Sequence, residues 1–128
     1  EIYRVLKFGG NFVCSDWLRS NDEKPSTEMI DYLKLEDLDF DMASPNRYKS
    51  ALSKAGFIDI MLKNRNQWYL EQAKREVYIL SQLNRTEFEK ISSKKYMDLS
   101  IETWWAMIKV LETGEHCPHH IWCTKPNI

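Results

Sequence analysis

The sequence predicts an α/β fold in which a small sheet is covered by helices. Three short apolar or alternating runs, at residues 11–17, 57–63 and 119–125, have the composition of strands. Amphipathic segments with a helical repeat separate these runs, and strands that alternate with helices are typical of an α/β sheet. Because about three short strands would leave poorly covered edges, we expect the chain to be the later part of a larger doubly wound domain.

The first segment is predicted to be the end of a helix that leads into a strand. Residues 1–7 place apolar side chains on one helical face. Gly9 and Gly10 are expected to end this helix, because glycine adopts the left-handed conformation without steric cost. The apolar run at 11–17 is then read as a buried strand, with Asp16 near its carboxyl end.

Two helices are predicted between the first two strands. Residues 27–36 form the first of them, with Ser26 or Thr27 as its N-cap. The second begins after Ser44, carries proline in its first turn and ends at Gly56.

Three more helices are predicted before the last strand. A long amphipathic helix covers residues 66–83. A shorter one is expected to start at Thr86, since Glu89 stands three residues later at capping-box spacing. Ser100 is expected to cap a third helix over 101–114.

Composition narrows the class of protein. The 128 residues are 43% hydrophobic and 29% charged, as in ordinary globular domains. A formal net charge of -1 predicts no nucleic-acid partner, and no apolar run reaches the length that spans a bilayer, so no membrane association is expected. Cys14, Cys117 and Cys123 form no Cys-x-x-Cys pair and are odd in number, which favours a reducing, cytoplasmic environment.

Two segments resemble metal sites but fit poorly. On a strand, Cys117, His119 and Cys123 would share one side, although tetrahedral zinc needs a fourth ligand and no second pair is present. The acidic run at 36–41 lacks the glycine and terminal glutamate of a calcium loop. We therefore predict no metal and interpret the two segments as the entry to a strand and a solvated connection.

Several motifs in chain order resemble the Rossmann-like S-adenosylmethionine-dependent methyltransferases. The string "VLKFGG" before a strand ending in "SDW" is similar to the helix and Gly-Gly turn that lead into the fifth strand of that family, with Phe8 where proline is usual. The string "YKSALSKAGFIDI" resembles the helix that precedes the sixth strand. The region from "QAKREVYIL" to "HHIWCTKP" is similar to a narrower group, the phosphoethanolamine and the sarcosine/dimethylglycine N-methyltransferases.

The resemblance implies that the cofactor is S-adenosylmethionine and that its main binding loop is not in this chain. Such enzymes bind the cofactor with a strand, a Gly-x-Gly loop and a helix, where glycine lets backbone amides approach closely. The four glycines of this chain form no Gly-x-Gly. We therefore expect residues 1–128 to be a single partial methyltransferase domain from the fifth strand onward, inactive in isolation.

Asp16 and Trp17 are candidate substrate-binding residues. Residues after the fifth strand line the acceptor pocket in this fold, and the position of Trp17 resembles that of an acceptor-contacting tyrosine in the phosphoethanolamine enzymes. Aromatic faces and a nearby carboxylate suit an amine. The alternative is that Trp17 packs under the following loop while Asp16 merely caps that loop.

Tyr32 and Lys109 complete the predicted substrate-binding set. In the phosphoethanolamine enzymes a tyrosine like Tyr32 is followed four residues later by an arginine that holds the phosphate, whereas this chain has Glu36. A carboxylate repels phosphate, so this difference favours a small amine or amino acid. Lys109 aligns with a basic residue that reaches the acceptor's anionic group. The alternatives are an ordinary helix contact for Tyr32 and a solvent-exposed lysine for Lys109.

The sequence thus predicts part of an S-adenosylmethionine-dependent methyltransferase that N-methylates a small-molecule amine. It identifies no catalytic base. The alternative is a non-catalytic interaction module, which would form a homodimer or exchange strands through an exposed sheet edge.

Overall fold

The computed structural model describes residues 1–39 and 41–128, which form two compact units. We call the first the sheet unit; it comprises Glu1–Glu23, Met42–Arg65 and Cys117–Ile128. We call the second the helical unit; it comprises Lys24–Asp41 and Asn66–His116. The helical unit is therefore built from two insertions in the sequence of the sheet unit.

The elements agree with the predicted α/β class. Those of the sheet unit are α1 (Ile2–Val5), β1 (Asn11–Asp16), α3 (Pro45–Lys54), β2 (Ile58–Asn64) and β3 (His119–Thr124). Those of the helical unit are α2 (Thr27–Leu35), α4 (Asn66–Tyr78), the π-helix η1 (Ile79–Leu83), α5 (Arg85–Ile91) and α6 (Lys94–Glu112). All three predicted strands and the intervening helices are present, so the expected fold class is confirmed.

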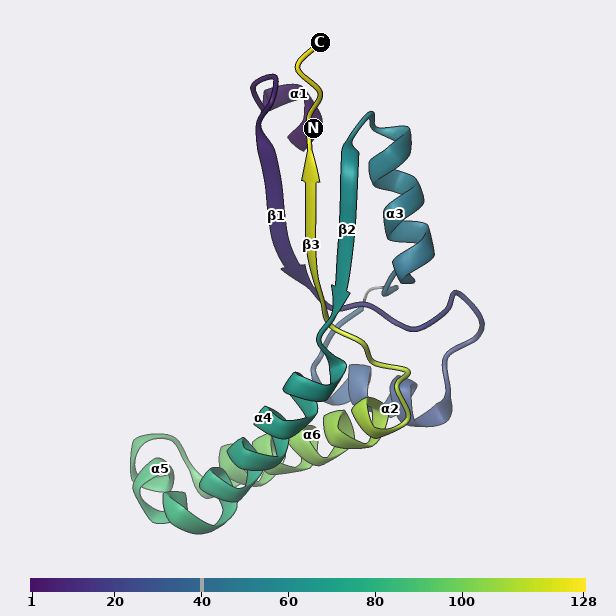
Figure 1. Ribbon diagram of the computed structural model, residues 1–128. Helices are drawn as coiled ribbons and strands as arrows, with labels where there is room; N and C mark the ends of the chain where they lie inside the picture. The colour runs from purple at the N-terminus through teal and green to yellow at the C-terminus, as the bar shows by residue number, and fades with distance from the viewer. Residues whose placement is uncertain (40) are drawn as a thin grey trace. The chain divides into compact units, whose positions relative to one another are not determined.

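The last strand of the chain lies in the middle of the sheet. The order is β1-β3-β2, and β3 pairs antiparallel with both neighbours (Figure 1). Val13 and Met61 both lie opposite Trp122 across the sheet. In β2 the register shifts between Ile58 and Met61, and Asp59 has a φ of 51°, the geometry of a bulge.

One face of the sheet carries the core of the sheet unit. Ile121 and Cys123 of β3 are buried there with Leu52 and Phe57, and Tyr48 packs against them. Ile121 and Cys123 are two residues apart on β3, so the period of two places both on this face, where Leu52 and Tyr48 of α3 pack against them.

The other face of the sheet is apolar and exposed. Val13, Met61 and Trp122 are 66%, 57% and 46% exposed. The prediction of a buried strand at 11–17 is therefore wrong for one of its two faces. A largely apolar run is typical of a strand that is buried on both faces. Both faces are buried, however, only when other elements cover each of them.

The turn after α1 is closed by a lysine as well as by glycine. The helix ends at Val5, earlier than Gly9 and Gly10 suggested. Lys125 Nζ donates to the carbonyls of Tyr3 and Leu6 at 2.7 and 2.8 Å, and a cation suits the carbonyl end of a helix. Gly9 has a φ of +72° and lies in the following turn.

The predicted caps of α2 and α3 are confirmed. Ser26 Oγ accepts from Met29 N at 3.1 Å, and Ser44 Oγ accepts from Arg47 N at 3.0 Å. Each serine satisfies a backbone donor that has no partner within its own helix. Gly56 follows α3 with a φ of 101°, as expected of a glycine that ends a helix.

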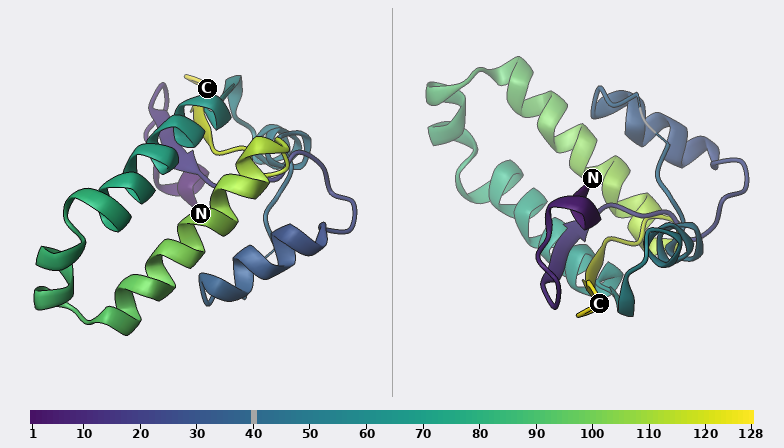
Figure 2. Two further views of the ribbon diagram at one scale, coloured as in Figure 1. Left: turned by 90° about the horizontal axis from the view of Figure 1, so that it is seen from below. Right: turned by 90° about the horizontal axis from the view of Figure 1, so that it is seen from above.

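In the helical unit, α6 packs against both α2 and α4 (Figure 2). Met29, Val77, Met107 and Leu111 are among the buried side chains. Asn66 fixes the start of α4, because its Nδ2 donates to the carbonyls of Leu111 and His116, each at 2.8 Å.

The two predicted starts in the later helices are wrong. Ser93, and not Ser100, is the N-cap of α6, and its Oγ accepts from Tyr96 N at 3.1 Å. Ser100 lies inside the helix and donates to the Tyr96 carbonyl at 2.9 Å. The first two turns of α6 mix lysines and an aspartate with Tyr96 and the buried Met97, so the sequence pattern did not reveal that the helix begins there.

The expected capping box of α5 is also absent from the described residues. The helix begins at Arg85 with Asn84 as its N-cap, so Thr86 lies within the first turn. Glu89 pairs with the guanidinium of Arg85 rather than with a backbone amide. An arginine at four-residue spacing thus competes for the carboxylate that the capping-box pattern assigns to the backbone.

No helix among residues 1–39 and 41–128 is both long enough and apolar enough to cross a membrane. The acidic connection after α2 has no regular secondary structure where it is described, and its residue 40 lies outside the described part of the chain.

The cap assignment of α6 predicts a difference between two serines. Ser93→Ala should lower the free energy of unfolding by about 1 kcal/mol, because an N-terminal amide loses its acceptor. Ser100→Ala, its matched control, removes only a hydroxyl that bonds within the helix and should change stability by less than about half of that. Urea denaturation followed by circular dichroism measures both values, and a larger loss for Ser100→Ala would contradict the assignment.

Candidate functional site

A cluster of three polar side chains lies at the carboxyl end of β1 in the sheet unit. Alternation along the strand places Cys14 and Asp16 on the same face. Tyr48 of α3 lies with its hydroxyl 3.7 Å from Cys14 Sγ. Burial, the Cys14 thiol and then the Asp16 carboxylate raise the pKa of Tyr48 far above its ordinary value. The phenol therefore stays protonated and serves as a hydrogen-bond donor.

Asp16 keeps an exposed carboxylate beside this phenol. One of its oxygens accepts from Trp17 N at 2.8 Å, which is the loop-capping geometry that formed the alternative interpretation of Asp16. A carboxylate has further acceptor positions beyond this one, so the same residue is also able to accept from an ammonium group.

Trp17 is half-buried and follows β1 directly. An aromatic ring and a carboxylate thus stand on consecutive residues, and these are the two kinds of group that suit an amine.

Tyr32 lies in the core of the helical unit. Its side chain is fully buried, and its ring centroid is 5.6 Å from that of His116. Burial, followed by the charge of Glu36, raises the pKa of the phenol strongly. Glu36 ends α2 as its C-cap residue and so keeps a carboxylate near this hydroxyl.

Lys109 lies on the exposed face of α6, between buried Ile108 and Val110. Of the four predicted substrate-binding residues, Asp16 and Trp17 belong to the sheet unit, whereas Tyr32 and Lys109 belong to the helical unit. The two tryptophans of α6 differ in their surroundings, because Trp105 is 50% exposed while Trp104 donates its Nε1 proton to Glu76 at 2.8 Å.

Sequence reasoning missed Tyr48. The signal was present, because Tyr48 precedes the buried Leu52 by four residues and so shares its helical face. The sequence did not reveal that this face of α3 meets the end of β1 that carries Asp16.

The cysteine and histidine cluster near β3 has no metal-binding geometry. Among residues 1–39 and 41–128, no three His, Cys, Asp or Glu side chains converge as metal ligands. His119 Nδ1 instead lies 2.5 Å from the Cys117 carbonyl. Burial raises the pKa of the Cys117 and Cys123 thiols, which disfavours the thiolate that zinc requires.

Solved structures define the class of this fold. The chain superimposes on phosphoethanolamine N-methyltransferase 2 of Haemonchus contortus with a TM-score of 0.86 and 21% identity, over 98% of this chain and 28% of that one. A putative sarcosine dimethylglycine methyltransferase of Galdieria sulphuraria matches with a TM-score of 0.84 and 17% identity, over 99% and 46% of the two chains. The fold is that of the Rossmann-like S-adenosylmethionine-dependent methyltransferases.

Sequence relatives identify a narrower group. A phosphoethanolamine N-methyltransferase of Triticum aestivum is 29% identical over 115 residues, which are 90% of this chain and 22% of that protein. Phosphoethanolamine N-methyltransferase 1 of Arabidopsis thaliana is 33% identical over 88 residues, 69% of this chain and 16% of that protein. No family model matches the chain.

The chain is thus homologous to the phosphoethanolamine N-methyltransferases, and the predicted relation to that group is confirmed. It spans about a fifth of the length of the curated relatives that it matches.

The buried thiol of Cys117 predicts a loss of stability at high pH. Burial raises its pKa from 9.0 to about 11. Between these values the unfolded chain releases the proton while the folded chain retains it, so the free energy of unfolding falls as pH rises. From pH 8 to 10.5 we expect this thiol to account for a loss of about 2 kcal/mol.

Urea unfolding of the parent protein and of Cys117→Ala at both pH values measures this contribution. The variant should lose about 2 kcal/mol less than the parent over the interval. Equal losses in the two proteins would show that the Cys117 thiol ionises alike in the folded and unfolded states.

Proposed function

We propose that this chain is the acceptor-side part of an S-adenosylmethionine-dependent methyltransferase that N-methylates a small amine or amino acid. The observation that carries this proposal is the match of 115 residues, 90% of the chain, to a phosphoethanolamine N-methyltransferase. The fold of the described residues agrees with this relation over 98% of their length.

Asp16 and Trp17 are the residues that we assign to the acceptor amine. Methyl transfer needs a neutral amine aligned with the sulfonium, so the protein contributes mainly alignment and exclusion of water. The Trp17 ring supplies an apolar wall, and the Asp16 carboxylate accepts hydrogen bonds from the amine. Tyr48 supports this assignment, because its phenol stays protonated and lies close enough to the Asp16 carboxylate to interact with it.

Tyr32, Glu36 and Lys109 bear on the choice of acceptor. Glu36 places a negative charge beside Tyr32, which disfavours a phosphate there. Lys109 offers an exposed cation that suits a carboxylate-bearing acceptor. We therefore propose that Tyr32 and Lys109 serve an amine such as a methylated glycine rather than a phosphobase.

The cofactor-binding residues are proposed to lie in another part of the enzyme. The glycines of this chain do not fit a S-adenosylmethionine cradle, since none forms a Gly-x-Gly. The space beside two of them is also taken, because a Cβ on Gly9 would meet Asn127 and one on Gly56 would meet the ring of Tyr3. When bound elsewhere in the enzyme, S-adenosylmethionine would supply the methyl group.

We also propose a cellular compartment and a class of partner for this chain. Cys14, Cys117 and Cys123 are all free thiols, which favours the cytoplasm. A net charge of -1 favours a small-molecule acceptor over nucleic acid. The exposed apolar face of Val13, Met61 and Trp122 supports the second candidate, an interaction module that dimerises.

The chain by itself should not bind S-adenosylmethionine tightly. Calorimetric titration of the isolated protein should give no heat of binding at micromolar concentrations, because the glycine-dependent cradle is not among its residues. The matched control is the complete wheat relative under the same conditions. Micromolar binding by the isolated chain would contradict the proposal that the cofactor-binding residues lie in another part of the enzyme.

Transplantation into the wheat relative tests the proposed activity. The chain replaces the 115-residue segment that it matches, and methyl transfer is followed with methyl-labelled S-adenosylmethionine. Sarcosine and dimethylglycine should be methylated faster than phosphoethanolamine. Within this chimera, Trp17→Ala and Asp16→Asn should each lower kcat/KM about tenfold, the scale of a desolvated cation–ring or cation–carboxylate contact.

Asp59→Asn is the control variant, since Asp59 is exposed on the β2 bulge and asparagine also tolerates its φ of 51°. Full activity of the Trp17 and Asp16 variants would contradict their assignment. A folded but inactive chimera, together with a dimer of the isolated chain in light scattering, would favour the interaction module.

A further inference from the structure

A cavity of about 450 Å³ lies within the helical unit, between η1, α5 and α6. Ile79, Leu80, Phe88, Tyr96 and Trp104 form much of its apolar wall, and Glu76 contributes the carboxylate among the residues that line it. This volume is in the range of small-molecule sites, which are largely apolar with a few polar groups that fix orientation.

The carboxylate is held at the wall of the cavity. Trp104 Nε1 donates to Glu76 Oε2 at 2.8 Å, which ties α4 to α6 and leaves the carboxylate with further acceptor positions. Glu76 is exposed to solvent, so its carboxylate is accessible from outside the cavity. A cationic group that enters the cavity would therefore meet an opposite charge at its wall.

Three aromatic rings accompany this carboxylate. Phe88 of α5 and Tyr96 and Trp104 of α6 all line the cavity. Ring faces attract a cation through their quadrupoles, and a tryptophan face does so most strongly. The lining therefore combines the two kinds of group that bind an organic ammonium.

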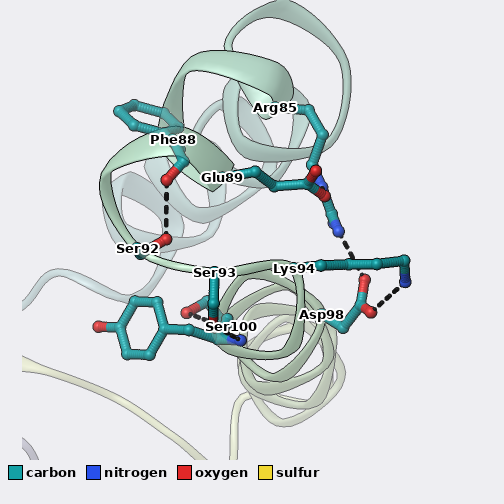
Figure 3. Close-up of polar contacts among 9 residues, drawn as sticks. Arg85, Phe88, Glu89, Ser92, Ser93, Lys94, Asp98 and Ser100 are labelled. Atoms are coloured by element: carbon teal, nitrogen blue, oxygen red, sulfur yellow. Dashed lines mark hydrogen bonds and ion pairs between the residues drawn. The ribbon is translucent and has the colours of Figure 1, made fainter.

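The neighbouring charges do not compete for Glu76. Arg85 is paired with Glu89 and Asp98, and Lys94 bonds to Asp98 at 2.6 Å. Figure 3 shows this network on the side of α5 away from Phe88. Arg85 and Lys94, two basic side chains at the α5–α6 junction, are thus paired with carboxylates other than Glu76.

The serine hydroxyls at the cavity are also occupied. Ser92 Oγ donates to the Phe88 carbonyl at 2.7 Å, as Figure 3 shows, and Ser100 Oγ donates to the Tyr96 carbonyl. Each bond lies within one helix. A ligand would therefore meet rings, aliphatic side chains and one carboxylate.

The backbone is irregular at the same place. Residues Ile79–Leu83 form a π-helix, and Ile79 and Leu80 from its first turn line the cavity. Single turns of π-helix are rare and are frequently found at functional sites. The irregular turn is a second observation at the cavity, independent of its side-chain chemistry.

We propose that this cavity binds an organic ammonium with an apolar chain, its cationic head between Glu76 and the ring of Trp104 and its chain along Ile79 and Leu80. The lining shares no residue with Asp16, Trp17, Tyr32 or Lys109. Along α6, Trp104 precedes Lys109 by five residues, a rise of roughly 7.5 Å.

Titration of the 128-residue chain with hexyltrimethylammonium tests the proposal. Calorimetry and tryptophan fluorescence should both report saturable binding. 1-Hexanol should bind at least about tenfold more weakly, because it has no charge for Glu76 or the rings, and hexanoate should not bind measurably. Equal affinity for the ammonium and the alcohol would overturn the proposal, as would no saturable binding of the ammonium at millimolar concentration.

Variants locate the site. Glu76→Gln should weaken binding of hexyltrimethylammonium about tenfold while affinity for 1-hexanol stays the same. Glu112→Gln is the matched control, because this exposed carboxylate of α6 pairs with Lys74 outside the cavity lining. Trp104→Phe keeps a ring but loses the bond to Glu76 and should weaken binding less than Trp104→Ala.

Thermal unfolding followed by circular dichroism shows which variants remain folded. If Trp104→Ala does not fold, the affinity of Trp104→Phe for hexyltrimethylammonium still tests the role of this side chain. Unchanged affinity in folded Glu76→Gln would overturn the proposal. Ile91 is 83% exposed at the rim. A dimer that Ile91→Glu converts to a monomer would assign the cavity to a second copy of the chain and would also overturn it.

Discussion

The pairing of β3 with both other strands is the constraint on which the sheet unit depends. β1 and β2 contact each other only through β3, so their backbone donors and acceptors on the inner side are satisfied by the last strand of the chain. Lys125, directly after β3, then holds the carbonyls at the end of α1. Removing the last dozen residues would therefore leave two strands without a partner and a helix end without its cation.

The helical unit follows from a different requirement. Its helices are amphipathic insertions that bury their apolar stripes against α6, which contacts α2, α4 and α5. The α-helical geometry gives way to a π-helix at η1, where the chain passes from α4 toward α5. The same stretch borders the cavity that contains Glu76 and Trp104. A π-helical turn, an apolar cavity and a carboxylate bonded to Trp104 therefore occur together in the helical unit.

The candidate site was only partly predictable. Asp16 and Trp17 could be found because their position after a strand and a Gly-Gly turn is local in the sequence. Tyr48 could not be assigned, because it is 32 residues from Asp16 and joins it only when α3 packs on the sheet. For Tyr32 the pattern indicated an amphipathic helix, but the pattern did not reveal that the phenol is fully buried beside His116.

The sequence by itself determined the α/β class, the three strands, the caps of α2 and α3 and the relation to the methyltransferases. Each of these depends on residues within a few positions of one another or on a pattern that persists along one element. Only the tertiary structure decided that β3 is central, that one face of β1 is exposed, and that Ser93 rather than Ser100 starts α6. These features depend on which surfaces meet, and contacts between residues far apart in the chain leave no periodic signal in either segment alone.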